Sequence, residues 1–303
     1  MNAIQTVNLT KQYGNRAVVK RIDLTVGEGE LYGFLGRNGA GKSTFINMMT
    51  GIIHPTEGQV KLLDASNRDD VLSQIGVLPD YSSYYDHLTA RQHLSYFSSI
   101  QGYKLSKNDV DVALEQVGLL EHANGKVGKF SFGMKKKLGI AQAIVHKPKL
   151  VFLDEPTSGV DAESSIHIQR LLQRLKNNGM TIFMTSHNLA EVEKICSSIA
   201  IMQSGIIADE GTLHSLQKKH SAQMEVTMKV SDDATTLLNA IQQLIGSVVH
   251  EGQTLAFRTD DEQRIGDVVR FLVRNGLTVY RIAINQPSLE DIFLKTHKGE
   301  REQ

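Results

Sequence analysis

Short apolar runs separated by helical stretches dominate the chain up to about residue 210. The runs predict strands because they are rich in Val, Ile, Leu and Phe and lie between turn-forming residues. They cover residues 3–9, 18–26, 31–35, 60–63, 75–78, 150–153, 181–184 and 199–202, with a helix predicted over 43–49. From about residue 88 to 147, apolar residues recur every three or four positions, which predicts a helical region. Strands that alternate with helices predict a parallel sheet covered on both faces.

A second unit with a different pattern begins after about residue 215. Its predicted elements are a strand over 224–230, a helix over 232–245, strands over 248–250 and 254–258, a helix around 265–272 and a strand over 278–284. This β-α-β-β-α-β order predicts a small ferredoxin-like α+β domain. Ser288, followed by Asp291, resembles the N-terminal cap of one more helix. We therefore expect two domains, residues 1–215 and 216–303.

Composition narrows the class of protein without indicating an activity. The chain has 303 residues, 41% hydrophobic and 22% charged, which is ordinary for a globular protein. Its 33 basic residues balance 33 acidic ones, so no nucleic-acid partner is expected. No apolar run approaches the ~18–20 residues that cross a bilayer, and the N-terminus lacks a secretory signal pattern. The single cysteine, Cys196, fits a reducing cytosol and is expected to be a buried, inert thiol in a helix.

A glycine-rich run between the strand at 31–35 and the helix at 43–49 carries the strongest chemical signal. It comprises Gly36, Arg37, Asn38, Gly39, Ala40, Gly41, Lys42, Ser43 and Thr44, which fits G-x-x-x-x-G-K-[ST]. The three glycines are expected to allow left-handed backbone, so that N–H groups cradle phosphate at a helix start. Lys42 would reach the β- and γ-phosphates, and the Ser43 hydroxyl would ligate Mg²⁺. A plain glycine-rich turn is the alternative, which the strand–loop–helix context disfavours.

Two adjacent carboxylates end the apolar strand at 150–153. Asp154 and Glu155 point in different directions at a strand end, so they can perform different tasks. Asp154 suits Mg²⁺ binding beside a phosphate loop, and Glu155 suits a general base that polarises the attacking water. The alternative is a charged strand end that Pro156 terminates. With the phosphate loop, the pair predicts a nucleotide triphosphatase.

A third run, Lys-Phe-Ser-Phe-Gly-Met-Lys-Lys-Lys at residues 129–137, lies between these two motifs. A helix is predicted over 134–147, with three lysines in its first turn. Each cation there destabilises the helix by about 0.3–1 kcal/mol through its interaction with the macrodipole. An anion bound at the helix start would offset this destabilisation. A solvated basic turn is the alternative.

These ordered motifs resemble the ATP-binding cassette (ABC) family over about residues 2–215. The family's signature at the third run is normally Leu-Ser-Gly-Gly-Gln; Ser131 and Gly133 match it, whereas Phe130, Phe132 and Met134 depart from it. A bulky Phe132 disfavours positive φ, which bears on the signature's backbone contacts. The resemblance implies an α/β P-loop NTPase cassette with a parallel sheet core, an antiparallel β subdomain and a helical subdomain over about 88–147. The C-terminal unit looks like the appendage of cassettes that serve bacterial drug, peptide and lipid exporters.

The resemblance also implies roles for single residues. Ser131 and Gly133 would bind the γ-phosphate of an ATP held by a second subunit, and Asp161 would help to align the two subunits. His187, which follows a strand in Thr-Ser-His, would contact the γ-phosphate and the attacking water. Tyr13 would stack on the adenine ring, with hairpin packing as the alternative.

Asp80 stands where the family usually carries Gln, sometimes Glu, in contact with Mg²⁺ and water. It keeps an oxygen ligand but is shorter, and its charge favours metal and repels phosphate. The nearby aromatic group Tyr81, Tyr84 and Tyr85 is a candidate dock for a membrane partner, with ordinary packing as an equal alternative.

The resulting hypothesis is an ATP-hydrolysing subunit that binds Mg²⁺–ATP at an interface between two ATP-binding subunits, in a homodimer or a heterodimer. Integral membrane permease subunits on separate chains would carry out transport, with export favoured, and would hold this chain at the cytoplasmic face of the membrane. The rival hypotheses are an ABC-type ATPase that works away from any transporter and a nucleotide-gated module without hydrolysis. The presence of both Glu155 and His187 disfavours the second rival.

Overall fold

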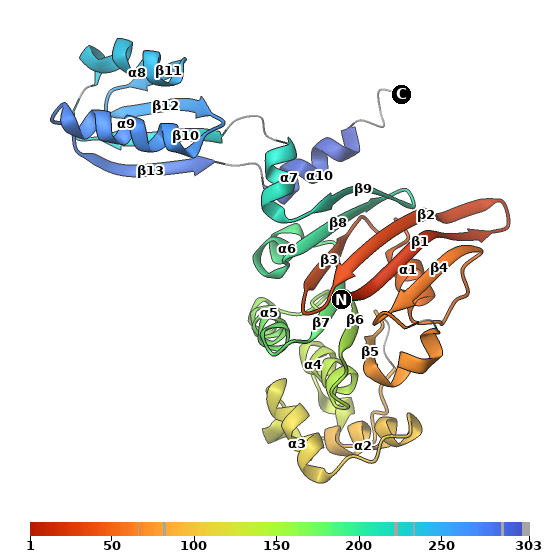
Figure 1. The fold of residues 1–303 in the computed structure, drawn as a ribbon. Helices are drawn as coiled ribbons and strands as arrows, with labels where there is room; N and C mark the ends of the chain where they lie inside the picture. The colour runs from red at the N-terminus through yellow and green to blue at the C-terminus, as the bar shows by residue number, and fades with distance from the viewer. Residues whose placement is uncertain (66, 81–82, 221–223, 233, 286–287, 299–303) are drawn as a thin grey trace. The chain divides into compact units, whose positions relative to one another are not determined.

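The structure, a computed structural model, describes residues 1–65, 67–80, 83–220, 224–232, 234–285 and 288–298 (Figure 1). These residues form two compact units that divide between residues 213 and 214. Each unit has its own hydrophobic core. Among the described residues, no helix combines the length and the apolarity that crossing a bilayer requires.

The first unit contains nine strands and six helices among its described residues, besides short 3₁₀ turns. In chain order they are β1 (Asn2–Tyr13), β2 (Arg16–Gly27), β3 (Leu31–Leu35), α1 (Lys42–Met49), β4 (Glu57–Leu62), η1 (Arg68–Gln74), β5 (Ile75–Leu78), α2 (Ala90–Ile100), α3 (Lys107–Gln116), η2 (Leu120–His122), η3 (Val127–Lys129), α4 (Phe132–Ile144), β6 (Leu150–Asp154), α5 (Ala162–Asn177), β7 (Thr181–Ser186), α6 (Leu189–Ile195), β8 (Ser198–Gln203) and β9 (Ile206–Gly211).

A six-stranded sheet in the order β5-β6-β7-β3-β8-β9 forms the centre of this unit. All neighbouring pairs are parallel except β8 and β9. Side chains on the two faces of each strand enter different cores, as the pleat requires. On β6, Phe152 packs with α1 and the antiparallel strands, whereas Val151 and Leu153 pack with α4 and α5. This double burial explains why the strands are continuous apolar runs rather than alternating ones.

An aromatic cluster around Phe183 fixes α1 against the central strands. The Phe183 ring centroid lies 5.7 Å from that of Tyr32, 5.4 Å from that of Phe34, 6.1 Å from that of Phe45 and 5.8 Å from that of Phe152. Offset and tilted pairs at these separations are favourable beyond their buried area. The cluster therefore ties β3, β6 and β7 to the helix that follows the glycine-rich loop.

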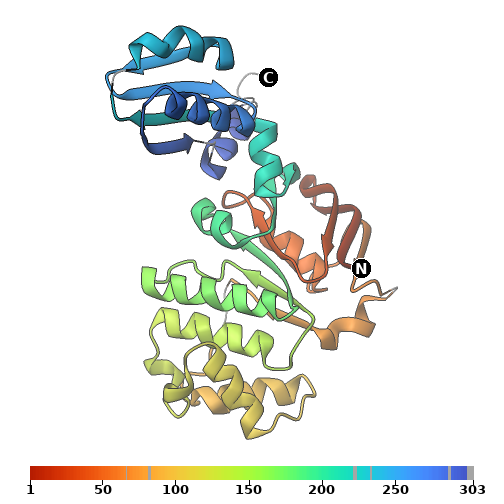
Figure 2. The ribbon, with the colours of Figure 1, turned by 60° about the vertical axis from the view of Figure 1, so that its left-hand side comes forward.

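Two further layers flank the sheet. Strands β2, β1 and β4 form an antiparallel sheet over one face, drawn in red and orange in Figure 1. Helices α2, α3 and α4 pack on one another at the other end, where Figure 2 shows the two yellow helices next to α4. Thr89 and Ser106 begin α2 and α3 with capping boxes, which satisfy the first free backbone N–H groups of each helix.

The second unit is ferredoxin-like, as predicted. It contains α7 (Leu213–His220), β10 (Met224–Val230), η4 (Thr235–Leu237), α8 (Leu238–Ile245), β11 (Val248–Glu251), β12 (Thr254–Thr259), α9 (Glu262–Arg274), β13 (Val279–Asn285) and α10 (Leu289–Lys298). The antiparallel sheet has the order β11-β12-β10-β13. Apolar side chains of β10 and β12 pack with those of α8 and α9 in a separate core. The Ser288 hydroxyl accepts the Asp291 N–H at 3.2 Å, which confirms the predicted helix cap.

The structure confirms the predicted α/β class and the strands named from the pattern, with three local differences. Strand β9 is absent from the predicted set, because its apolar run is short and is followed by Asp209 and Glu210. The α-helix predicted over 232–245 begins only at Leu238, after a 3₁₀ turn. Cys196 lies just after α6 in extended backbone rather than in a helix, and burial raises the pKa of its thiol.

The aromatic cluster generates a prediction for stability. Phe183→Ala should lower the free energy of unfolding of the first unit by about 3–5 kcal/mol, because it leaves a cavity where five rings meet. Hydrogen exchange of the β3 and β7 amides in the full chain measures the change. Ile52→Ala, at a side chain mostly open to solvent, is the matched control and should change exchange little. Equal protection in the two variants would contradict the role of the cluster.

His93 generates a prediction for pH. Its ring is fully buried in α2, the Nε2 atom donates to Gln142 Oε1 at 3.0 Å, and the ring centroid lies 4.6 Å from that of Phe97. Burial lowers the pKa of His93 below its ordinary 6.5. The unfolded chain therefore binds a proton near pH 6.5 that the folded chain does not, so stability is present above that pH and is lost as pH falls.

His93→Gln should flatten this acid dependence, which one histidine can steepen by at most about 1.4 kcal/mol per pH unit. Urea unfolding of the full chain between about pH 5 and 7.5, followed by circular dichroism, measures the slope. His87→Gln, at an exposed position, is the control and should leave the slope unchanged. A slope in His93→Gln as steep as that of the unchanged chain would refute the assignment.

Candidate nucleotide site

Three loops that carry the candidate residues leave the same edge of the main sheet. The glycine-rich loop follows β3, Glu155 follows β6, and His187 follows β7. These strands are parallel neighbours, with Leu35 opposite Ser186 and Asp154 opposite Thr185. Parallel strands end at a common edge, so residues more than a hundred positions apart meet there.

The loop from Gly36 to Lys42 owes its shape to two different properties of glycine. Gly39 and Gly41 have φ of 82° and 111°, the left-handed region that glycine adopts without strain. Gly36 does not have positive φ, so that expectation is wrong for it. A Cβ on residue 36 would instead lie 2.6 Å from the carbonyl oxygen of Met202, so close packing requires glycine at this position. Gly41 caps α1 without a side chain, which directs the N–H groups of the first turn toward the loop.

Lys42 is 6% exposed and lies across this loop. Its Nζ atom donates to the Gly36 carbonyl oxygen at 2.8 Å and lies 3.5 Å from the Arg37 carbonyl oxygen. The same atom is 3.5 Å from Glu155 Oε1. The lysine of the loop and the carboxylate of the β6 end are therefore partners in one buried ion pair. The remaining loop residues Arg37, Asn38 and Ser43 are exposed, whereas Ala40 is buried.

Thr185 on β7 holds the two carboxylate residues at the end of β6. Its hydroxyl donates to Asp154 Oδ1 and accepts the Glu155 N–H at 3.0 Å. Asp154 is buried, so this hydrogen bond supports a charge that burial would otherwise disfavour. Glu155 has φ of 52°, an uncommon left-handed conformation for a residue with a side chain. Backbone strain of this kind occurs where the surroundings fix a functional group.

The Glu155 carboxylate connects the loop lysine with the histidine after β7. The Nδ1 atom of His187 lies 2.8 Å from Glu155 Oε2. A carboxylate can only accept, so Nδ1 carries the hydrogen and Nε2 faces away from Glu155. The His187 side chain is 52% exposed, whereas that of Glu155 is 11% exposed. The arrangement thus has a buried carboxylate next to an accessible imidazole.

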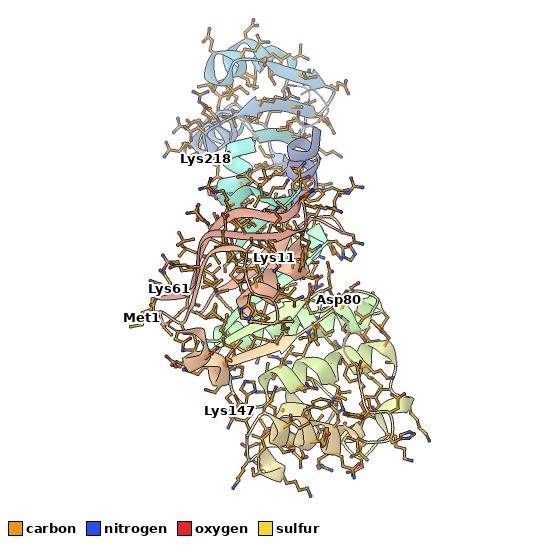
Figure 3. All side chains as sticks on the ribbon, turned by 90° about the vertical axis from the view of Figure 1, so that its right-hand side faces the viewer. Met1, Lys11, Lys61, Asp80, Lys147 and Lys218 are labelled. Atoms are coloured by element: carbon orange, nitrogen blue, oxygen red, sulfur yellow. The ribbon has the colours of Figure 1, made fainter. Side chains whose placement is uncertain are left out.

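Oxygen donors suitable for Mg²⁺ lie beside the loop. Ser43 is exposed in the first turn of α1, and the buried Asp154 is the last residue of β6. Within the described ranges, no cluster of three or more His, Cys, Asp or Glu side chains is arranged to hold a metal alone. This donor set fits Mg²⁺, which is usually held by one or two protein oxygens together with substrate phosphates. Asp80, labelled in Figure 3, has its Oδ1 atom 3.7 Å from Lys136 Nζ.

The signature run begins a helix, although not as the sequence predicts. Ser131 is the N-cap of α4, and its hydroxyl oxygen accepts the Met134 N–H at 3.2 Å. Phe132 is the first helical residue and does not have positive φ, so its size is compatible with the backbone there. Its 56% exposed ring lies over Gly159. A Cβ on Gly133 would lie 2.8 Å from Ser164 Oγ, so this glycine allows α4 to pack against the start of α5.

The expectation that the lysines after the signature form a basic first turn is wrong. Because α4 starts at Phe132, Lys136 falls in the second turn and is buried. Lys135 pairs with Asp86 at 3.1 Å, and Lys136 lies near Asp80. Burial lowers the pKa of Lys136, and the neighbouring carboxylates oppose that shift. The charge is thus stabilised inside the protein rather than offered to an anion at the helix start.

Two further candidates have local partners of their own. Asp161 is the N-cap of α5 and accepts the Ser164 N–H at 2.8 Å; these hydrogen bonds hold its pKa below the ordinary range. Tyr13 ends β1 with a half-exposed ring, and the Lys11 Nζ atom lies 5.1 Å from its centroid. The Lys11 cation lies over one face of this ring, so a stacked base would use the opposite face.

Three residues that contribute to the site are not among the candidates predicted from the sequence. Thr185 orients both carboxylates, and Lys136 contacts the Glu155 backbone. Glu191 is buried in α6, where burial raises its pKa and the Thr157 hydroxyl donates to Oε2 at 2.5 Å. The sequence can indicate the burial of Lys136, because a helix places it on one face with Gly133 and Ile140, but it does not indicate the partners of Lys136. Thr185 and Glu191 have no comparable signal.

Known proteins resemble this chain in sequence and in fold. A family model described as ABC transporter matches residues 19–158, and one described as ATP-binding protein DrrA1-3-like, C-terminal domain, matches residues 211–297. A solved ATP-binding subunit of an ABC transporter matches with a TM-score of 0.64 and 26% identity, covering 72% of this chain and 92% of that chain.

Curated relatives match over nearly their whole length. The bacitracin transport ATP-binding protein BcrA of Bacillus licheniformis is 36% identical over 300 residues, covering 98% of this chain and 97% of the relative. The Nod factor export ATP-binding protein I of Rhizobium sp. (strain N33) is 32% identical over 305 residues, covering 99% of this chain and 98% of the relative. The chain belongs to the family of ABC transporter ATP-binding proteins.

Proposed function

We propose that this chain binds Mg²⁺–ATP on the loop between β3 and α1 and hydrolyses it to drive export by a separate membrane subunit. The observation that carries the proposal is the connected set Lys42, Glu155 and His187 at one sheet edge. It combines a phosphate-binding cation and an imidazole, each of which contacts the same carboxylate. The names of the relatives, which include bacitracin transport and Nod factor export, support export as the process served.

In this proposal each member of the set has one task. Lys42 exchanges the loop carbonyls and Glu155 for the β- and γ-phosphates, which frees the carboxylate. Glu155 then accepts a proton from the attacking water as the general base. His187 orients the carboxylate through Nδ1–H and, when its second ring nitrogen also carries a hydrogen, donates Nε2–H to the γ-phosphate. Mg²⁺, held by Ser43 and Asp154 together with phosphate oxygens, would neutralise charge on the phosphates.

A second ATP-binding subunit completes the site in this proposal. Ser131 is exposed at the start of α4, and its oxygen already accepts a backbone N–H, so its hydroxyl hydrogen is available to donate. The helix N-terminus adds partial positive charge at the same point. Together they suit the γ-phosphate of an ATP bound to the partner, with Asp161 near the junction and Tyr13 stacked on the adenine of the same chain's ATP.

A membrane subunit is the other proposed partner, and it would hold the chain at the cytoplasmic face. Tyr85 is 51% exposed, and its ring centroid lies 5.4 Å from that of Tyr96 and 5.6 Å from that of Phe97 on α2. Tyr84 packs inward near His93, so it belongs to the core of the helical region. Tyr81 lies outside the described residues. The exposed rings of Tyr85 and Tyr96 are therefore the proposed contact of a permease helix.

Glu155→Gln should retain ATP binding and lower turnover at least about 100-fold, because the amide keeps the shape of the carboxylate but cannot accept the proton. Phosphate release and equilibrium nucleotide binding of the purified chain measure the two quantities. An ATP-dependent dimer should also accumulate in the variant, as measured by light scattering. Turnover at the unchanged rate would overturn the catalytic assignment.

Lys42→Ala should weaken ATP binding at least about tenfold, because it removes a charged hydrogen-bond donor from the phosphates. Binding of a fluorescent ATP analogue measures the affinity. The control is Lys147→Ala. Lys147, labelled in Figure 3, has an exposed side chain, and its Nζ atom lies 3.4 Å from Asp109 Oδ1. Unchanged affinity in Lys42→Ala would count against the phosphate site.

A further inference from the structure

The Lys136 side chain is a buried cation next to the catalytic residue, and no step of the proposed reaction uses it. It lies on α4, five positions after the Ser131 cap, and is 5% exposed. Charged lysines are rarely buried unless specific partners compensate for lost hydration. Its contacts should therefore reveal what the charge does.

Three acceptors surround the ammonium. Lys136 Nζ donates to the Glu155 carbonyl oxygen at 3.0 Å and lies 3.4 Å from the Asp80 carbonyl oxygen and 3.7 Å from Asp80 Oδ1. The two carbonyl oxygens lie within hydrogen-bonding distance of the ammonium, and Asp80 Oδ1 is close enough for an ion pair. The cation thus joins three separate segments: α4, the end of β6 and the segment after β5.

The Glu155 peptide needs such support because of its conformation. At φ of 52° it is left-handed, a conformation that is unfavourable for a residue with a Cβ. Thr185 holds the Glu155 N–H, while Lys136 holds the carbonyl oxygen from the other side. With both ends of the residue fixed, the carboxylate remains directed at Lys42 and His187.

The same cation links this residue to the signature. Lys136 and Ser131 belong to one continuous helix, so a displacement of the helix start carries the ammonium with it. The backbone and carboxylate of Asp80 contact the same atom. Movement of α4 would therefore be transmitted directly to the Glu155 peptide.

We propose that Lys136 is a positioning residue that couples the signature helix to the hydrolytic carboxylate, so that Ser131 engagement and Glu155 alignment occur together. This inference deepens the proposed function and rests on it. Lys136 touches no reacting atom; it acts through the Glu155 backbone. Its loss should therefore reduce the chemical step and leave nucleotide binding on the β3–α1 loop largely intact.

Lys136→Met tests this inference, because methionine fills similar space but leaves the three acceptors without a donor. We expect kcat to fall at least about tenfold, with KM and the affinity for a fluorescent ATP analogue within about threefold of the unchanged chain. Lys136→Arg, which keeps the charge and its donors, should restore part of the lost kcat. Lys135→Met, beside it on the same helix and paired with Asp86, is the matched control and should keep kcat.

Each outcome decides the question. If kcat in Lys136→Met equals that in Lys135→Met, the coupling role is refuted. A second variant, Lys136→Gln, is measured in the same way. If circular dichroism shows that both Lys136→Met and Lys136→Gln are unfolded, or if both lose nucleotide affinity as strongly as they lose kcat, Lys136 is merely structural and the inference also fails. Glu155→Gln in the same assay separates the two levels: if it too hydrolyses ATP normally, the proposed function fails first.

Discussion

The parallel pairing of β6, β7 and β3 is the constraint on which the rest of the molecule depends. Because these strands run in one direction side by side, their carboxyl ends meet, and the phosphate loop, the paired carboxylates and His187 share one edge. The cluster around Phe183 fixes this order by packing side chains of all three strands against α1. A displaced strand would separate the lysine from its carboxylate by a full strand spacing, about 4.8 Å.

Charge balance at that edge explains how so many ionisable groups are buried together. Two lysines, Lys42 and Lys136, and two acidic residues, Asp154 and Glu155, are all buried. Glu155 meets one lysine through its carboxylate and the other through its backbone oxygen. Buried charges are tolerated when their partners neutralise them and complete their hydrogen bonds. Removal of one of these groups would therefore leave another charge buried without its partner.

The residues of the candidate site all belong to the first unit of the chain. The first unit holds the phosphate loop, the carboxylates and the signature helix, all positioned by a sheet buried on both faces. The second unit builds an independent core from an antiparallel sheet and its helices. Its sheet has the first and third strands at the centre, an order that the β-α-β-β-α-β sequence permits without long crossings.

Local periodicity and fixed spacing within single segments suffice to predict the strands other than β9, the phosphate loop, the carboxylate pair and the ferredoxin-like order. Three features became evident only in three dimensions: the left-handed glycines of the loop, the helix start at Phe132, and the burial of Lys136 against Glu155 and Asp80. The physical reason is that burial and hydrogen-bond partners depend on segments distant along the chain. Lys136 contacts a residue 19 positions away and another 56 away, and no local pattern encodes either contact.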